Sequence, residues 1–220
     1  MKTAIGRCLN DSRINQRYSL TAAAAFIIVD LLFIAFNFGQ AARACLAVVA
    51  LATIVATLDG DLISTGFRLT PKQGWRAWIR TSTIVGVAAG LCIGAAATAI
   101  YLSGHAVPIY IPPPDNLAHR FVSMCLVAPV MEETLYRFVI CVPLVVLLGE
   151  WPTDAISGLL FGALHVVYGN PSPENLVGGF FLAWAFLKSE TILIPVILHS
   201  VGNSIALAAQ VAGWYFVNQT

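Results

Sequence analysis

The sequence predicts an all-α fold, a polytopic bundle of about seven transmembrane helices. Of the 220 residues, 58% are hydrophobic and only 10% are charged, and the mean hydropathy is +0.80. Soluble domains carry about 25% charged residues, so this chain has too few charges to cover a water-facing surface. The apolar residues also run in long unbroken blocks rather than in the alternating pattern of barrel strands. Helices are therefore the structure that satisfies the backbone in a bilayer.

Three predicted spans lie in the N-terminal half of the chain, at residues 20–38, 41–58 and 81–102. Each is close to the roughly 20 apolar residues that cross a bilayer. The polar segment 59–80 between the second and third spans combines tryptophans with cations, which is typical of a membrane-surface segment. Its cations and tryptophans are Arg68, Lys72, Trp75, Arg76, Trp78 and Arg80.

The third predicted span carries glycine at every fourth residue, at Gly86, Gly90 and Gly94. Small residues at this spacing line one face of a helix and let a neighbouring helix approach closely. The pattern predicts that this face packs against another span.

Four further spans are predicted in the C-terminal half, at residues 117–148, 153–168, 176–187 and 191–217. Before them, the loop 103–116 contains Pro108 and a run of three prolines at 112–114, which exclude a helix there. Pro129 and Pro143 predict a break or bend within the span 117–148.

Charge and cysteine content exclude some partners and favour others. The net charge is +1 and no basic stripe is present, which argues against a nucleic-acid partner. The five cysteines are scattered without a Cys-x-x-Cys pair, so we interpret them as small apolar residues. Cations in the N-terminal tail and in segment 59–80 predict that these parts are cytoplasmic. We expect an integral protein of a bacterial cell membrane.

Three charged residues lie near the middle of the predicted span 117–148, namely Glu132, Glu133 and Arg137. An unpaired charge at the centre of a membrane helix costs about 2.5–3.5 kcal/mol, so three would cost on the order of 8–10 kcal/mol. Glu133 and Arg137 are four residues apart and share one side of a helix, which predicts an ion pair. Glu132 is left over and needs a proton or a partner on another helix.

Two later spans supply polar residues at a similar depth. His165 lies in the span 153–168, and His199 and Asn203 lie four residues apart in the last span. Each residue alone can be explained without catalysis. A single membrane histidine more often packs against or hydrogen-bonds to its neighbours than it catalyses a reaction, and a Glu–Arg pair can be purely structural. Asp30 is interpreted as a carboxylate that faces the bundle or snorkels to the membrane surface, and it is given no functional role. The combination of all these groups on three spans favours a shared polar cavity.

The three motifs resemble those of the CPBP family (CAAX prenyl protease/bacteriocin-processing, also called Abi) of intramembrane endopeptidases. The matching patterns are Glu132-Glu133-x-x-x-Arg137, Phe161-x-x-x-His165 and His199-x-x-x-Asn203, and the resemblance covers about residues 117–207. It implies that residues 117–220 form a catalytic helical core. Residues 1–116 would then supply N-terminal spans and the surface segment of the same membrane domain.

The resemblance also implies a role for each motif residue. Glu132 is the catalytic carboxylate, and His165 acts with it on the attacking water. His199 and Asn203 stabilise the oxyanion. Glu133 and Arg137 support the site.

Metal dependence and function stay open to alternatives at this point. Glu132, His165 and His199 could bind zinc, but the chain lacks a His-Glu-x-x-His motif, and we favour a site without a cofactor. The expected substrate is a hydrophobic or lipidated peptide or protein within the lipid bilayer. The alternatives are a proton-coupled transporter, since buried Glu and His also form proton relays, and a non-catalytic membrane or immunity module.

Overall fold

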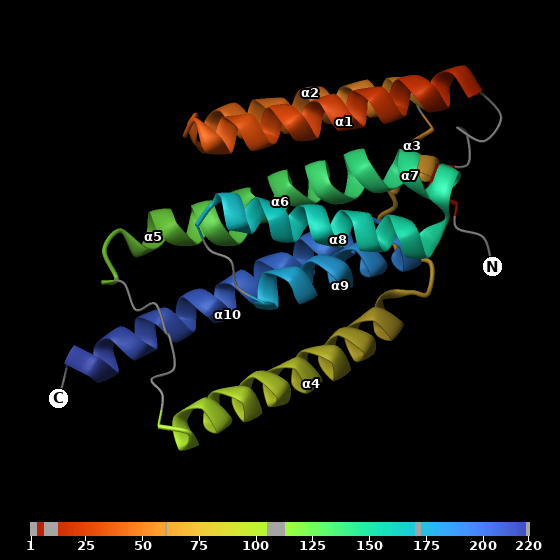
Figure 1. Ribbon diagram of the computed structural model, residues 1–220. Coiled ribbons are helices and arrows are strands. Elements are labelled where there is room, and N and C mark those ends of the chain that lie inside the picture. The colour runs from red at the N-terminus through yellow and green to blue at the C-terminus, as the bar shows by residue number, and fades with distance from the viewer. Residues whose placement is uncertain (1–3, 7–12, 60, 105–112, 170–172, 219–220) are drawn as a thin grey trace.

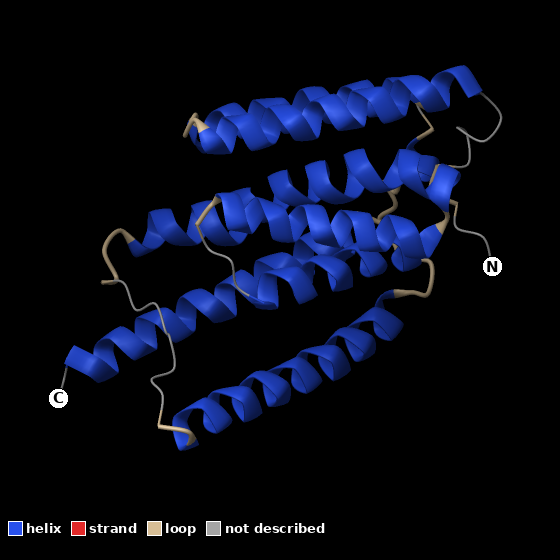
Figure 2. Cartoon of the chain, in the orientation of Figure 1, coloured by secondary structure: helices blue, strands red, loops and turns tan. Residues whose placement is uncertain are grey.

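The computed structural model describes residues 4–6, 13–59, 61–104, 113–169 and 173–218. Over these residues every regular element is a helix, as Figure 2 shows, and the prediction of an all-α fold is confirmed. The long helices run roughly side by side (Figure 1). The hairpin of α1 and α2 lies on one side of the central helices, and α4 lies on the other.

The helix bounds follow the predicted spans closely. The N-terminal half contains α1 (Arg13–Ala35), α2 (Gly39–Thr57), α3 (Leu62–Thr65) and α4 (Trp75–Leu102). The next run consists of α5 (Leu117–Arg120), η2 (Phe121–Val127), α6 (Ala128–Glu133), η3 (Thr134–Val139) and α7 (Ile140–Leu148), where η2 and η3 are π-helical. The chain ends with α8 (Glu150–Val167), α9 (Pro173–Ser189) and α10 (Leu193–Asn218).

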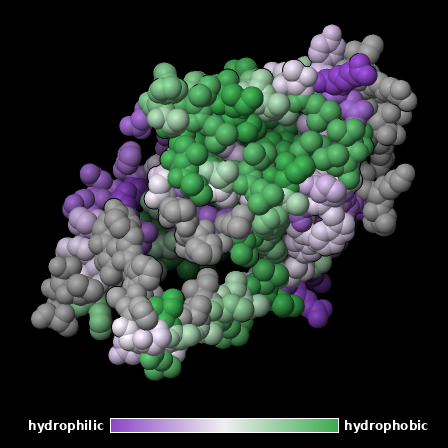
Figure 3. All heavy atoms as spheres, in the orientation of Figure 1, coloured by the Kyte–Doolittle hydropathy of each residue, from purple (hydrophilic) through white to green (hydrophobic). Residues whose placement is uncertain are grey.

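Three helices in the described part of the chain are long and apolar enough to cross a membrane. They are Asn15–Ala35, Gly39–Thr57 and Leu193–Phe216, and the apolar helix Val177–Ser189 is shorter. Apolar side chains cover most of the middle of the molecular face in Figure 3, while hydrophilic ones gather towards its two ends. The chain is therefore an integral membrane protein.

The helical run from Leu117 to Leu148 continues through both prolines, so of the predicted break or bend the break does not occur. Pro129 lies in the first turn of α6, directly after the π-helix η2. In η2 the Ala128 amide donates five residues back, to the Ser123 carbonyl. By the same pattern the Met124 carbonyl would take the proton of residue 129, which proline lacks. The helix tolerates Pro129 because another residue fills that gap, as described below.

Close helix packing occurs between α8 and α9 through two glycines. A Cβ on Gly179 would lie 2.9 Å from the Gly158 carbonyl oxygen, and a Cβ on Gly158 would lie 2.6 Å from the Phe180 ring. Neither position has room for a side chain, so these glycines set the distance between the two helices.

The glycine face of α4 is not packed in this way. Ideal Cβ atoms on Gly86, Gly90 and Gly94 would meet nothing within 4 Å. Instead α4 contacts the bundle near its start, where Trp78 is buried and its ring centroid lies 5.5 Å from that of Trp184. The packing predicted for the glycine stripe was thus wrong for this structure, because the loop before α4 fixes only its first turns.

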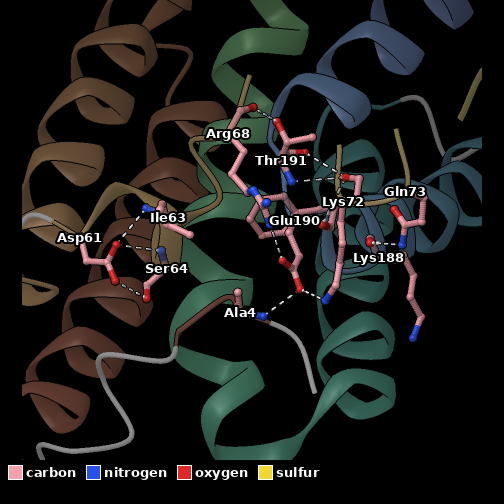
Figure 4. Close-up of polar contacts among 12 residues, drawn as sticks. Ala4, Asp61, Ile63, Ser64, Arg68, Lys72, Gln73, Lys188, Glu190 and Thr191 are labelled. Atoms are coloured by element: carbon pink, nitrogen blue, oxygen red, sulfur yellow. Dashed lines mark hydrogen bonds and ion pairs between the residues drawn. The ribbon is translucent and has the colours of Figure 1, made fainter. Parts of the chain in front are cut away.

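Glu190, in the loop between α9 and α10, ties three segments together (Figure 4). Its side chain accepts hydrogen bonds from the Ala4 amide at 2.8 Å, from Arg68 at 2.8 Å and from Lys72. Burial would raise the pKa of Glu190, but the Lys72 and Ala4 hydrogen bonds and the two cations outweigh it and hold the pKa below its ordinary value. Glu190 even adopts a left-handed conformation, with φ 55°, that usually selects glycine.

We expect Glu190→Gln to lower the free energy of unfolding by about 2 kcal/mol at neutral pH, because charge-assisted hydrogen bonds are lost. A depressed folded-state pKa adds stability that is complete above the unfolded-state pKa near 4.5 and disappears as the pH falls through the folded-state value. Thermal unfolding from pH 7 to pH 3 should therefore bring variant and wild type together at the acidic end.

Glu150→Gln is the matched control, because Glu150 also pairs with a lysine, Lys188, but both side chains are partly exposed. Such pairs contribute roughly 0–1 kcal/mol. Equal losses in the two variants would contradict the importance assigned to Glu190.

Candidate active site

A buried ion pair forms at the junction of α6 and η3. Arg137 Nε lies 3.0 Å from Glu133 Oε2, and both side chains are fully buried, which confirms the predicted pair. Arg137 also donates to Ser157 Oγ at 2.9 Å, and its guanidinium lies 4.6 Å from the centre of the Phe161 ring. The π-helical turn of η3 places Arg137 where it reaches α8, and π-helical segments are frequent at functional sites.

His199 of α10 connects the two neighbouring glutamates. Its Nδ1 lies 2.8 Å from Glu133 Oε1, and its Nε2 lies 4.0 Å from Glu132 Oε2. A carboxylate only accepts hydrogen bonds, so Nδ1 carries the proton that is donated to Glu133. Nε2 is then directed towards Glu132, which is only 5% exposed. Glu132 therefore faces the interior of the bundle and lies within the reach of a bridging water from His199.

His165 lies beside the same aromatic ring as His199. Its Nδ1 pairs with the Phe161 carbonyl at 2.9 Å within α8, so Nε2 is the nitrogen left for chemistry. The Phe161 ring centroid lies 4.6 Å from that of His165 and 5.6 Å from that of His199. The two imidazoles thus flank one aromatic side chain, and the three sequence motifs meet around it.

Asn203 is engaged with the helix that precedes the glutamates. Its Nδ2 donates to the Met124 carbonyl at 2.7 Å. Met124 is the residue whose carbonyl loses its π-helical donor to Pro129, so the amide fills that gap. In this structure Asn203 is therefore a link between α10 and η2, one helical turn from His199.

A second charged group adjoins Glu132 and was missed by the sequence analysis. Arg43 of α2 donates to both carboxylate oxygens of Asp30, at 2.6 and 2.9 Å, and its Nη1 lies 3.8 Å from Glu132 Oε1. The Tyr136 hydroxyl donates to Asp30 at 3.0 Å. Asp30 precedes the end of α1 by five residues and Arg43 follows the start of α2 by four. A signal was present, because opposite charges at matching distances from a tight turn meet in a helical hairpin.

The zinc alternative receives no support from the arrangement of the side chains. Among the residues that the structure describes, no group of three His, Cys, Asp or Glu lies close enough together to hold a metal ion. Glu132, His165 and His199 belong to these residues and do not form such a set. The positions of their side chains thus do not fit a three-ligand zinc site.

An apolar groove of about 680 Å³ lies between the start of the α5–η2 run and α10. It is lined by Leu117, Ala118, Phe121, Ser204, Leu207, Ala208, Val211 and Ala212. The same two helical runs carry Met124, Asn203 and, further along, Glu132 and His199. The groove is therefore bordered by the helices that form the candidate site.

Residues 114–205 match the sequence profile of a family described as "Type II CAAX prenyl endopeptidase Rce1-like". This segment is an Rce1-like domain, a member of the CPBP/Abi family. No curated protein and no solved structure matches the chain. The family is one of hydrolases that act as proteases, and the resemblance inferred from the three motifs is confirmed.

The Rce1-like domain contains all the residues predicted for the site. They are Glu132, Glu133, Arg137, His165, His199 and Asn203. Asp30 and Arg43, by contrast, lie in the α1–α2 hairpin outside the matched segment. The cluster around Glu132 thus combines the Rce1-like domain with a part of the chain that precedes it.

Proposed function

We propose that the protein is an intramembrane endopeptidase that hydrolyses a peptide bond of a membrane-associated or lipidated peptide or protein. The observation that carries the proposal is the pairing of Glu132 with His199. Glu132 Oε2 lies 4.0 Å from His199 Nε2 in a buried setting, while Glu133 holds the other nitrogen of the same ring. Family membership supports the reaction class, and the cluster supplies groups suited to it.

In the proposed reaction Glu132 is the general base. It takes a proton from water, whose oxygen attacks the carbonyl carbon of the scissile bond. The proton then passes to the amide nitrogen as the C–N bond breaks, so that an acid and an amine are released. His165 orients the water through Nε2.

The negative oxygen of the intermediate needs donors in a site without bulk water. Asn203 and the imidazolium form of His199, which carries a proton on Nε2 as well as on Nδ1, are the proposed donors. Each such donor contributes roughly 3–4 kcal/mol to the transition state. In this step the Asn203 amide breaks its hydrogen bond to the Met124 carbonyl and donates to the negative oxygen of the intermediate instead. Glu133 holds the imidazole of His199, Arg137 holds Glu133, and neither touches the substrate.

We infer that all seven long helical segments cross the membrane. Three of them meet the criteria of length and apolarity directly. We infer that the N-terminus is cytoplasmic, because Lys and Arg are concentrated before the apolar run that begins at Leu20 and in segment 59–80. The site then lies within the bilayer, and residues 117–220 form its catalytic core.

The apolar groove between η2 and α10 supports a hydrophobic substrate. Its lining is almost entirely aliphatic and aromatic, so it suits a lipid chain or an apolar peptide segment. A substrate held there would reach the cluster along the faces of the two helices that carry Glu132 and His199. In this proposal the scissile bond lies further along the same two helices, within the membrane rather than in the aqueous phase.

The test is cleavage of a panel of lipidated and hydrophobic peptides by the purified protein, followed by mass spectrometry. We expect wild type to cut at least one peptide, Glu132→Gln and His165→Ala to cut none, and a strong chelator to leave the rate unchanged. Cleavage by both variants at the wild-type rate would disprove the assignment.

The two other functions give different results in the same preparation. A proton-coupled transporter would produce substrate-dependent proton flux in liposomes without product peptides. A non-catalytic membrane module would show neither activity, and Glu132→Ala would leave its cellular phenotype unchanged.

A further inference from the structure

Arg43 is oriented by Asp30 so that one of its nitrogens faces Glu132. Nε and Nη2 donate to the two oxygens of Asp30, at 2.6 and 2.9 Å, and Nη1 lies 3.8 Å from Glu132 Oε1. A guanidinium presents its donors in a rigid planar fork. Fixing one edge of the fork on Asp30 therefore fixes the direction of Nη1.

The surroundings of Arg43 hold it firmly. Asp30 is fully buried and Arg43 is 3% exposed. The Tyr136 hydroxyl donates to Asp30 at 3.0 Å, and the Tyr168 ring centre lies 5.1 Å from the guanidinium carbon. Because solvent is excluded, the attraction between Arg43 and Glu132 is only weakly screened.

Glu132 therefore lies between two nitrogen groups from different helices. Arg43 Nη1 is near Oε1 and His199 Nε2 is near Oε2, at 3.8 and 4.0 Å. Both distances are too long for a direct hydrogen bond. The two nitrogen groups therefore orient the Glu132 carboxylate, and its oxygens can still bind a water. If Arg43 served only to join α1 to α2, its hydrogen bonds to Asp30 would be sufficient and none of its nitrogens would need to face Glu132.

We propose that Arg43 is a positioning residue of the hydrolytic site, which holds the Glu132 carboxylate opposite His199. Asp30 and Tyr136 hold Arg43 in turn. The inference rests on the proposed proteolytic function and extends its site to the α1–α2 hairpin, outside the Rce1-like segment 114–205. The hairpin is then a part of the enzyme's working site rather than only a membrane anchor.

Two variants separate positioning from simple joining of the hairpin. The double variant Asp30→Asn/Arg43→Gln replaces the buried ion pair by two neutral amides, so neither charge is left without its partner. Arg43→Lys keeps a charge for Asp30 but has no second branch to reach Glu132. We expect kcat per folded protein to fall at least tenfold in both variants, with KM changed less than threefold.

The partly exposed pair Glu150–Lys188 provides the control, because Glu150→Gln/Lys188→Gln also neutralises an ion pair between two helices. This control should keep the wild-type kcat. A wild-type kcat in Arg43→Lys or in the double variant overturns the inference. If wild type cuts and Glu132→Gln does not in the same assay, the proposed function stands regardless. If wild type cuts nothing, or Glu132→Gln cuts equally well, the proposed function fails and the inference fails with it.

Discussion

Replacement of Arg137 by methionine is expected to lower the free energy of unfolding by about 3–5 kcal/mol. Arg137 is fully buried, and its loss leaves the Glu133 carboxylate without its cation in the centre of the bundle. Breaking a buried pair by removing one partner costs this much because the remaining charge is uncompensated. Methionine fills a similar volume, so the effect reports the charge rather than a cavity.

The unfolding temperature should fall by roughly 10 °C in detergent, given a shift of about 2–4 °C per kcal/mol for a protein of this size. Cys125 and Cys141 are buried and can report unfolding through a thiol-reactive dye, after all thiols that react in the folded protein, including the exposed Cys45 and Cys92, are blocked. This measurement needs no substrate and is independent of the proposed function.

Arg80→Met is the matched control, because Arg80 is exposed on α4 and should change stability by less than about 0.5 kcal/mol. The double variant Glu133→Gln/Arg137→Met should lose less than the sum of the two single variants, since it removes both charges of a contacting pair. Additive losses would show that Glu133 and Arg137 do not stabilise each other.

Helix positions were predictable from the sequence because the bilayer imposes a simple rule on composition and length. Each predicted span coincides with a long helical segment, and the Glu133–Arg137 pair follows directly from helical spacing. The continuity of the helix through Pro129 was not predictable from proline content. It depends on the π-helical turn before Pro129 and on the amide of Asn203, which comes from a distant helix.

The partners of Glu132 illustrate the limit of local patterns in the candidate site. Spacing within one helix predicts which side chains share a face, and it correctly left Glu132 without a partner on its own helix. It does not predict which other helix faces that side. Arg43 lies inside the predicted span 41–58, but no pattern within that span shows that the helix buries Arg43 on the side that faces Glu132.

Exchange of His199 for asparagine or for glutamine is expected to separate the two functions of its ring. Asparagine places an N–H close to the position of Nδ1, so His199→Asn keeps the hydrogen bond to Glu133 that the wild type makes at 2.8 Å. It removes the nitrogen that faces Glu132 and the proposed oxyanion. Loss of one such donor lowers kcat by about 10²–10³. We therefore expect His199→Asn to fold stably and to lose nearly all turnover.

His199→Gln should show the opposite combination, a lower stability and a higher turnover than His199→Asn, because the longer amide places its N–H near the position of Nε2. Glu133 then lacks one partner in a buried site, which costs about 1–3 kcal/mol of stability, while a donor beside Glu132 remains and part of the turnover is kept. Thermal unfolding and kcat, measured on the same preparations, should thus rank the two variants oppositely. The same ranking in both measurements would mean that His199 acts only through Glu133, and another group would then have to serve the oxyanion.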